Sequence, residues 1–171
     1  MNVEGNGQIE GVLCFFVKHY KTLLARKTRN IGEGTFNGYG GGLEENDKSL
    51  EECCVREVFD ECGIKVDPKK LRKFGIVYFH NLKSDGEFFI VKVHVFIATE
   101  WKGEPKESVE MANPQWYSID DLPLRYMMSA DEFWFPRIVV FGRKIIAHAY
   151  QDLRLKKLLR PVEIREVEFF S

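Results

Sequence analysis

A run of glycines that leads directly into a sharply patterned helix constrains this chain more than any other feature. Gly38-Tyr39-Gly40-Gly41-Gly42 precedes a segment, Ser49–Cys62, that predicts a helix. Ser49 and Glu52 have the spacing of a capping box, and Gly63 is a typical helix stop. At about 100° per residue, the apolar side chains lie in one arc: Cys54, Val55, Val58, Phe59 and Cys62. We therefore expect one face of this helix to pack against a core.

The same helix carries three carboxylates, Glu57, Asp60 and Glu61, within a separate arc of about 100°. A solvated acidic face is one interpretation. Against it, like charges at this spacing destabilise a helix by about 0.2–0.5 kcal/mol, and the helix dipole disfavours anions near the C-terminal end. A bound divalent cation would reverse both penalties. Because oxygen ligands select hard ions, the pattern predicts Mg²⁺, with Mn²⁺ as an alternative, rather than zinc.

Strand-like and helix-like segments alternate along the rest of the chain. A length of 171 residues fits a single domain spanning 1–171. Strands are predicted at Val12–Val17, Thr22–Arg26, Leu71–Phe79, Glu87–Thr99 and Gln115–Ile119, a second helix at Asp131–Ile146, and one or two closing strands within Ala147–Phe170. Loops are predicted at Thr28–Gly42 and Glu100–Ala112, and a hairpin turn at Asn81–Gly86. This order predicts an α/β fold in which α-helices sandwich a mixed β-sheet.

Charge and composition argue against several classes of protein. Lys and Arg total 25 against 26 Asp and Glu, so the net charge is −1, which disfavours stable binding to nucleic acid or an anionic membrane. No apolar run approaches the roughly 20 residues of a membrane-spanning helix, and the stretch Met1–Gln8 has no apolar signal core. Four cysteines and four histidines show no zinc-ligand or disulfide spacing. We therefore expect a cytoplasmic protein with reduced thiols.

The helix and the residues before it resemble the Nudix box. Arg56-Glu57-Val58-x-Asp60-Glu61-x-Gly63-Ile64 matches the whole second half of that pattern, R-E-U-x-[ED]-E-x-G-U, where U is aliphatic. The first half, G-x5-E-x7, departs from it. In one register Gly42 is the box glycine and Lys48 occupies the glutamate position. In the other, Gly41 is the box glycine, Asp47 replaces the glutamate and the loop gains one residue. We prefer the second register because it keeps an acid before the helix.

Further segments are similar to the mammalian-type MutT branch of this family, the 8-oxo-dGTP diphosphatases. They are Phe36–Gly41, Val93–Phe96, Glu107–Met111, Phe133–Pro136 and Ile164–Val167. The resemblance implies the Nudix fold. It also implies Mg²⁺-dependent hydrolysis of oxidised purine nucleoside triphosphates, such as 8-oxo-dGTP, to a nucleoside monophosphate and pyrophosphate. Such an activity removes damaged nucleotides from the pool of DNA precursors.

The resemblance also assigns roles to the acidic residues. It implies metal ligands at Glu57, Asp60, Glu61 and the carbonyl oxygen of Gly41. Glu110 matches a further acidic position that binds metal or serves as general base, and Arg56 would orient a box glutamate. Phosphoryl transfer depends mainly on charge neutralisation and an aligned water. No Ser/His/Asp or Cys/His arrangement in the sequence competes with these acids.

A substrate pocket is implied at Lys27, Asn37, Phe79, Met128, Asp131 and Trp134, with Ile31 as a further wall. Asn37 and Asp131 would hydrogen-bond the purine, and Trp134 would stack on it. Met128 and Ala130 replace a tryptophan and an aspartate of the resembled enzymes, which predicts weaker base selectivity. A simpler interpretation stays open for four of these residues. Asn37 is then a turn residue, Lys27 an exposed lysine, and Phe79 and Ile31 plain core residues.

We expect a small nucleotide as the partner and a monomer, with a dimer left open. Two other functions remain as alternatives. One is the same chemistry on a dinucleotide polyphosphate, ADP-ribose or capped RNA. It is disfavoured because Phe79-His80-Asn81-Leu82 lacks the tyrosine or proline typical of some such subfamilies. The other is a non-catalytic nucleotide-binding module, which is disfavoured because Glu57 and Glu61 are present.

Overall fold

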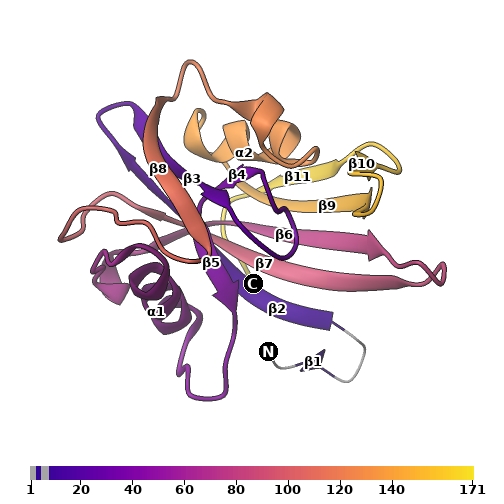
Figure 1. Cartoon of the computed structure of the whole chain (residues 1–171), viewed down its shortest axis with the longest axis horizontal. Coiled ribbons are helices and arrows are strands. Elements are labelled where there is room, and N and C mark those ends of the chain that lie inside the picture. Colours follow the sequence, from indigo (N-terminus) through magenta and orange to yellow (C-terminus); the bar gives the residue numbers. More distant parts are fainter. Residues whose placement is uncertain (1–2, 5–7) are drawn as a thin grey trace.

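A curled, mixed β-sheet occupies the centre of the molecule, and helices α1 (Leu50–Cys62) and α2 (Asp131–Val139) lie on opposite sides of it (Figure 1). The computed structural model describes residues 3–4 and 8–171, so the expectation about Met1–Gln8 lies largely outside the described residues. The strands are β1 (Val3–Glu4), β2 (Gln8–Lys18), β3 (Lys21–Lys27), β4 (Phe36–Asn37), β5 (Tyr39–Gly42), β6 (Arg72–Leu82), β7 (Phe88–Ala98), β8 (Met111–Ser118), β9 (Lys144–Asp152), β10 (Lys157–Leu158) and β11 (Glu163–Val167). Two short 3₁₀ turns, η1 (Pro68–Lys70) and η2 (Leu124–Tyr126), complete the elements. The predicted fold class is confirmed.

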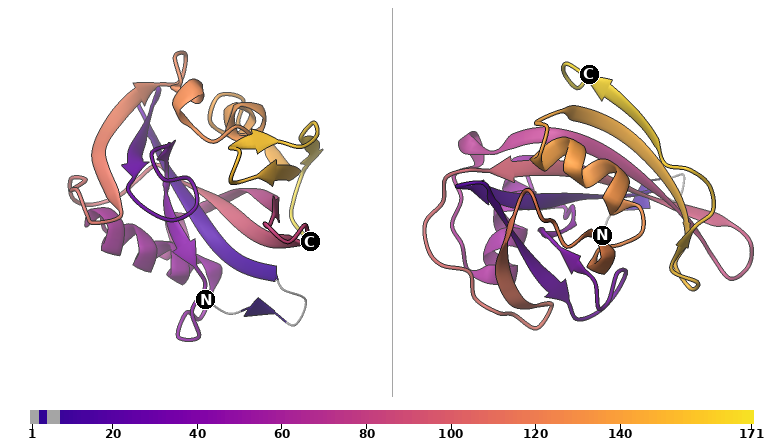
Figure 2. Two further views of the ribbon diagram at one scale, coloured as in Figure 1. Left: turned by 45° about the vertical axis from the view of Figure 1, so that its right-hand side comes forward. Right: turned by 90° about the horizontal axis from the view of Figure 1, so that it is seen from above.

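Strand β2 lies in the middle of the sheet and separates two apolar cores. It pairs in parallel with β7 and antiparallel with β5, and β6 pairs antiparallel with β7 and in parallel with β9. Successive side chains of a strand point to opposite faces. Val12, Cys14 and Phe16 therefore join the core under α1, whereas Leu13 and Phe15 join the core under α2. Figure 2 shows α2 lying across its face of the sheet beside β9.

Helix α1 begins and ends where the sequence predicts. Ser49 Oγ accepts from the Glu52 N–H at 3.1 Å, and the Glu52 carboxylate accepts from the Lys48 N–H at 3.2 Å. At the other end Gly63 has φ 76° and donates to the Phe59 carbonyl at 2.9 Å. The predicted apolar arc is only partly right. The Phe59 side chain is 49% exposed, whereas Cys53 is fully buried against the core.

The glycine-rich segment is not the continuous loop predicted for Thr28–Gly42, because its last residues form β4 and β5. The glycines of β5 permit close approach rather than turns. A Cβ on Gly40 would lie 2.0 Å from the Val12 carbonyl oxygen on the paired strand β2. Any larger residue would push the two strands apart. The glycines of this segment were therefore correctly singled out, but those of β5 allow close strand pairing and do not form a loop.

The predicted helix Asp131–Ile146 is also corrected, because α2 ends at Val139 and the chain re-enters the sheet as β9. Pairing with β6 fixes this segment as a strand, and Ile145, Ala147 and Ala149 are buried on one face. The turn predicted at Asn81–Gly86 is shorter, since β6 continues to Leu82 and the Gly86 N–H closes the turn on the Lys83 carbonyl at 3.1 Å. Strand β8 likewise begins at Met111, within the predicted loop Glu100–Ala112.

The closing strands expected within Ala147–Phe170 are confirmed as the end of β9 with β10 and β11. Over residues 3–4 and 8–171, neither α-helix combines the length and the apolar character needed to cross a lipid bilayer.

Candidate active site

A cavity of about 510 Å³ extends from the C-terminal half of α1 to the start of α2, although the two helices lie on opposite sides of the curled sheet. Strands β2, β5, β6 and β7 contribute its floor, and residues 29–31 and 128–134 contribute to its walls. Carboxylates gather at one end, and aromatic and amide side chains gather at the other. Residues 29–31 and 128–134 are about a hundred residues apart in the sequence, so only the fold brings them to one cavity.

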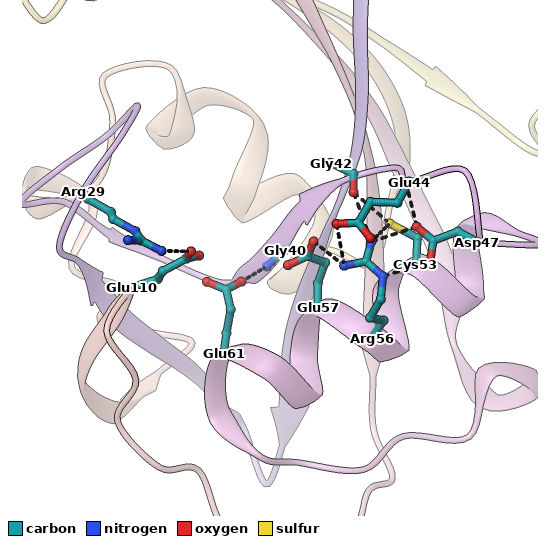
Figure 3. Close-up of polar contacts among 10 residues, drawn as sticks. All are labelled: Arg29, Gly40, Gly42, Glu44, Asp47, Cys53, Arg56, Glu57, Glu61 and Glu110. Atoms are coloured by element: carbon teal, nitrogen blue, oxygen red, sulfur yellow. Dashed lines mark hydrogen bonds and ion pairs between the residues drawn. The ribbon is translucent and has the colours of Figure 1, made fainter. Parts of the chain in front are cut away.

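Glu57 and Glu61 occupy the carboxylate end, one helical turn apart on α1 (Figure 3). Glu61 is 5% exposed, and its Oε1 accepts a hydrogen bond from the Gly40 N–H at 2.7 Å. Burial raises the pKa of Glu61 to about 8, although the Gly40 hydrogen bond favours its charged form. Burial also raises the pKa of Glu57, against the opposing effect of the Arg56 guanidinium. A nearby cation would therefore stabilise the charged forms of Glu57 and Glu61.

Arg56 connects the helix to the loop before it. Its Nε and Nη2 bind Asp47 Oδ1 and Oδ2 at 2.9 and 2.7 Å, and its Nη1 binds Glu57 Oε1 at 2.8 Å. The guanidinium lowers the pKa of Asp47 to about 2. Lys48 is exposed and forms no ion pair with the residues that the structure describes. The contacts of Asp47 favour the register in which Asp47, rather than Lys48, stands at the variable box position.

Glu110 reaches the cavity from the loop before β8, where it forms an ion pair with Arg29. The Thr28 N–H donates to the Glu110 carbonyl at 3.0 Å and fixes this loop beside the end of β3. Figure 3 shows Glu110, Glu61 and Glu57 following one another between Arg29 and Arg56. Arg29 also lines the cavity and was not singled out from the sequence. The sequence feature that could have identified Arg29 is a second basic residue two positions after Lys27.

The donor set at this end fits a hard divalent cation, because it consists of carboxylate and carbonyl oxygens. Gly41 allows the approach: a Cβ there would lie 2.4–2.6 Å from the Glu57 carboxyl group. Within residues 8–171, no three His, Cys, Asp or Glu side chains already surround one point that could hold a metal ion. Glu57 and Glu110 are instead paired with arginines. Asp60 is exposed on α1 and is not among the residues that line the cavity.

Asp131 and Trp134 contribute to the opposite end of the cavity from α2. Asp131 is 2% exposed, and its oxygens accept from Trp134 Nε1 at 3.0 Å and from the Met128 N–H at 3.3 Å. Burial raises the pKa of Asp131 to about 7. Lys27 links the two ends, since burial lowers the pKa of its ammonium while Glu61, Glu110 and Asp131 all act to raise it. A carboxyl group that is partly neutral near pH 7 can donate as well as accept hydrogen bonds.

The other residues predicted for the substrate pocket also line the cavity: Asn37, Phe79, Met128 and Ile31. Asn37 Oδ1 accepts from the Gly38 N–H at 2.8 Å, which leaves the amide N–H groups of Asn37 for a ligand. Two buried residues of the wall, Asn81 and Gln151, were not predicted. Asn81 was assigned to a turn, and Gln151 lay in a tail of ambiguous structure. Each amide follows apolar residues at the alternate positions of its strand, Phe79 before Asn81 and Ala149 before Gln151, so a single amide at the end of an apolar strand face was the available signal.

Comparisons with known proteins agree with this geometry. The chain is 38% identical over 124 residues to a zebrafish protein named oxidized purine nucleoside triphosphate hydrolase, covering 72% of this chain and 75% of that protein. A mouse protein of the same name is 32% identical over 159 residues, covering 92% and 95%. A solved MutT protein of Bacillus halodurans superposes with a TM-score of 0.77 at 25% identity, covering 91% and 97%. The NUDIX domain matches residues 9–138. The chain therefore belongs to the Nudix family.

Proposed function

We propose that this protein hydrolyses oxidised purine nucleoside triphosphates, such as 8-oxo-dGTP, to the nucleoside monophosphate and pyrophosphate. The observation that carries the proposal is that one cavity is lined both by the carboxylates Glu57, Glu61 and Glu110 and by Asn37, Asp131 and Trp134. The names of the zebrafish and mouse relatives support the same substrate class. Removal of damaged triphosphates from the nucleotide pool follows as the cellular role.

We assign Glu57, Glu61 and Glu110 as the side chains that would hold Mg²⁺, with Mn²⁺ as a substitute and the Gly41 carbonyl as a further ligand. The metal would neutralise phosphate charge and lower the pKa of a bound water. Asp60 stays a predicted ligand on the same helix. Glu61 and Glu110 are also the candidates for accepting the proton of the attacking water, because both line the cavity and Glu61 has a raised pKa. Arg56 holds Glu57 in place through the contact at 2.8 Å.

Lys27 and Arg29 supply positive charge beside the carboxylates, where the triphosphate would lie. Asn37 and Asp131 would recognise the edge of the purine through hydrogen bonds. Phe79, Met128 and Trp134 would contact its faces. With Ala130 in place of a second acid, fewer hydrogen bonds hold the base, and selectivity between related purines is lower than in the resembled enzymes.

We also propose that the protein acts as a cytoplasmic monomer on free nucleotides, without stable binding to nucleic acid. The balanced net charge of −1 supports this part of the proposal. Size-exclusion chromatography with light scattering tests the oligomeric state directly.

The decisive experiment is a product assay with Mg²⁺ on 8-oxo-dGTP, 2-hydroxy-dATP, dGTP and dCTP, with ADP-ribose and a dinucleotide polyphosphate beside them. We expect pyrophosphate rather than orthophosphate, and the highest kcat/KM for an oxidised purine. Equal values for all four triphosphates would remove oxidised-purine hydrolysis as the function. Preference for ADP-ribose or the dinucleotide would support the same chemistry on another substrate, and binding without turnover would indicate a non-catalytic module.

A further inference from the structure

The wall of the cavity includes a buried pair of amides that the proposed function leaves without a role. Asn81 and Gln151 are 1% and 4% exposed, and both line the cavity. They stand at paired positions of the parallel strands β6 and β9. Buried polar groups in proteins are nearly always hydrogen-bonded. If one polar atom of a buried amide pair has no hydrogen-bond partner in the protein, a ligand group is expected to supply that partner.

Two hydrogen bonds determine which atoms the pair presents to the cavity. The backbone carbonyl of Phe79 can only accept, so Asn81 Nδ2 faces it at 3.3 Å. Asn81 Oδ1 is thereby turned toward Gln151 and accepts from its Nε2 at 2.8 Å. Gln151 Oε1 remains as an acceptor, and no hydrogen bond to it is formed within residues 8–171.

This oxygen is not sealed inside the protein. The fully buried polar atoms without a partner in the described part of the chain are Thr22 Oγ1, Tyr39 OH and His94 Nδ1. Gln151 Oε1 is not among them, so this unpartnered oxygen keeps some accessible surface, and it belongs to a residue that lines the cavity.

The pair also lies beside the wall against which a base would rest. Phe79 lines the same cavity two residues before Asn81 on β6, and the two side chains share one face of the strand. Alternate residues on a strand are about 7 Å apart, which is comparable to the width of a base. Ala149 is paired with Phe79 in the sheet and is fully buried in the core, so it does not project into the cavity beside Gln151. A ring that contacts Phe79 can thus bring one edge to Gln151.

Oxidation at C8 changes this edge of a purine in one respect that an amide oxygen can distinguish. An ordinary purine presents N7 as an acceptor, whereas an 8-oxopurine carries a hydrogen on N7. We propose that Gln151, oriented by Asn81, accepts a hydrogen bond from the N7–H of an 8-oxopurine and so determines selectivity against the unoxidised base. An ordinary purine would place its N7 lone pair against Oε1, and the two acceptors would repel each other. This inference rests on the proposed function and names the group that separates oxidised from normal substrate.

The test measures kcat/KM for 8-oxo-dGTP, dGTP and 7-deaza-dGTP, in which a C–H replaces N7. The wild-type protein should favour 8-oxo-dGTP over 7-deaza-dGTP, and 7-deaza-dGTP over dGTP, because removing the lone pair relieves repulsion without adding a donor. Gln151→Met keeps the size of the side chain and removes the acceptor. It should lower the ratio of 8-oxo-dGTP to dGTP by at least about tenfold. Gln115→Met makes the same change at an exposed residue of β8 outside the cavity and should leave the ratio unaltered.

The outcomes separate this inference from the proposed function. No wild-type preference for 8-oxo-dGTP over dGTP would overturn both. A clear wild-type preference that Gln151→Met retains would overturn the role of Gln151 and leave the function standing. Should Gln151→Met fail to fold by circular dichroism, the wild-type comparison decides alone. Turnover of 7-deaza-dGTP at or below that of dGTP would then overturn the inference, and turnover above it would support the inference.

Discussion

Arg56 binds the Asp47 carboxylate through two hydrogen bonds, from Nε to Oδ1 at 2.9 Å and from Nη2 to Oδ2 at 2.7 Å. The same guanidinium binds Glu57 Oε1 through Nη1 at 2.8 Å. Arg56 therefore links Asp47, in the loop before α1, to Glu57, which lines the cavity. An acid in this loop can influence the site through Arg56, without itself lining the cavity.

The first prediction follows from this connection. Asp47→Ala removes both hydrogen bonds, so Arg56 can rotate and Glu57 loses its fixed position. We expect kcat for 8-oxo-dGTP to fall by about tenfold or more. Lys48→Ala removes an exposed side chain without an ion pair among the described residues and should change kcat by less than about twofold. The reverse ranking in steady-state assays would restore Lys48 to the variable box position.

The second prediction concerns the metal and Glu61. Chelation should abolish hydrolysis, and Mg²⁺ or Mn²⁺ should restore it. Glu61→Gln keeps an oxygen for the Gly40 N–H but removes the charge, so kcat should fall by at least about 100-fold. Mn²⁺ affinity, measured by electron paramagnetic resonance without nucleotide, should fall as well.

A matched control and a stability measurement complete this test. Glu104→Gln makes the same change at an exposed loop residue and should behave as wild type. The Tm of the metal-free Glu61→Gln protein near pH 7 should be close to that of wild type, because burial already favours the neutral form of Glu61 and the amide keeps an acceptor for the Gly40 N–H. Normal turnover would mean that Glu61 is not part of the catalytic machinery, and a large fall in Tm would indicate a structural role.

The third prediction uses the raised pKa of Asp131, from 3.8 to about 7. Between these values the native protein keeps a proton that the unfolded chain has lost. The free energy of unfolding therefore decreases as pH rises through this window, by up to about 1.4 kcal/mol per pH unit. Asp131→Asn cannot titrate, so its slope should be shallower than that of wild type by the contribution of Asp131, while Glu61 and Glu57 keep theirs. Urea unfolding at several pH values between about 4 and about 8, with chelator present, checks it. Parallel curves for wild type and variant would show that Asp131 has an ordinary pKa.

Local signals in the sequence were sufficient for parts of the fold that depend on neighbouring residues. The cap at Ser49, the stop at Gly63 and the carboxylates of α1 lie within one segment, and the structure places the helix accordingly. Contacts between distant segments were not predictable in this way. Arg29 meets Glu110 across 81 residues, and Gln151 meets Asn81 across 70. The apolar run Ile145-Ile146 suited a helix as well as a strand, and only its pairing with β6 decided between them.

The last prediction concerns the role of Asp131 with substrate. Its oxygens already accept from Trp134 Nε1 and the Met128 N–H, and it is 2% exposed, so it is rigidly placed and far from bulk water. Asp131→Asn retains the shape but fixes the group in a neutral state. Because the NH2 group of Asn cannot accept from Trp134 Nε1 or the Met128 N–H, the side chain should lose its placement at the base end of the cavity, and kcat/KM for purine triphosphates should fall by about tenfold or more, whereas Mn²⁺ affinity should change little. The wild-type kcat/KM should also decrease above about pH 7 through loss of the neutral carboxyl group, and this inflection should be missing from Asp131→Asn. Steady-state assays with 8-oxo-dGTP, dGTP, 2-hydroxy-dATP and dCTP across this pH range provide the measurement. An unchanged pH profile, or a loss of metal affinity equal to the loss of turnover, would move Asp131 out of the base pocket and into the support of the metal site.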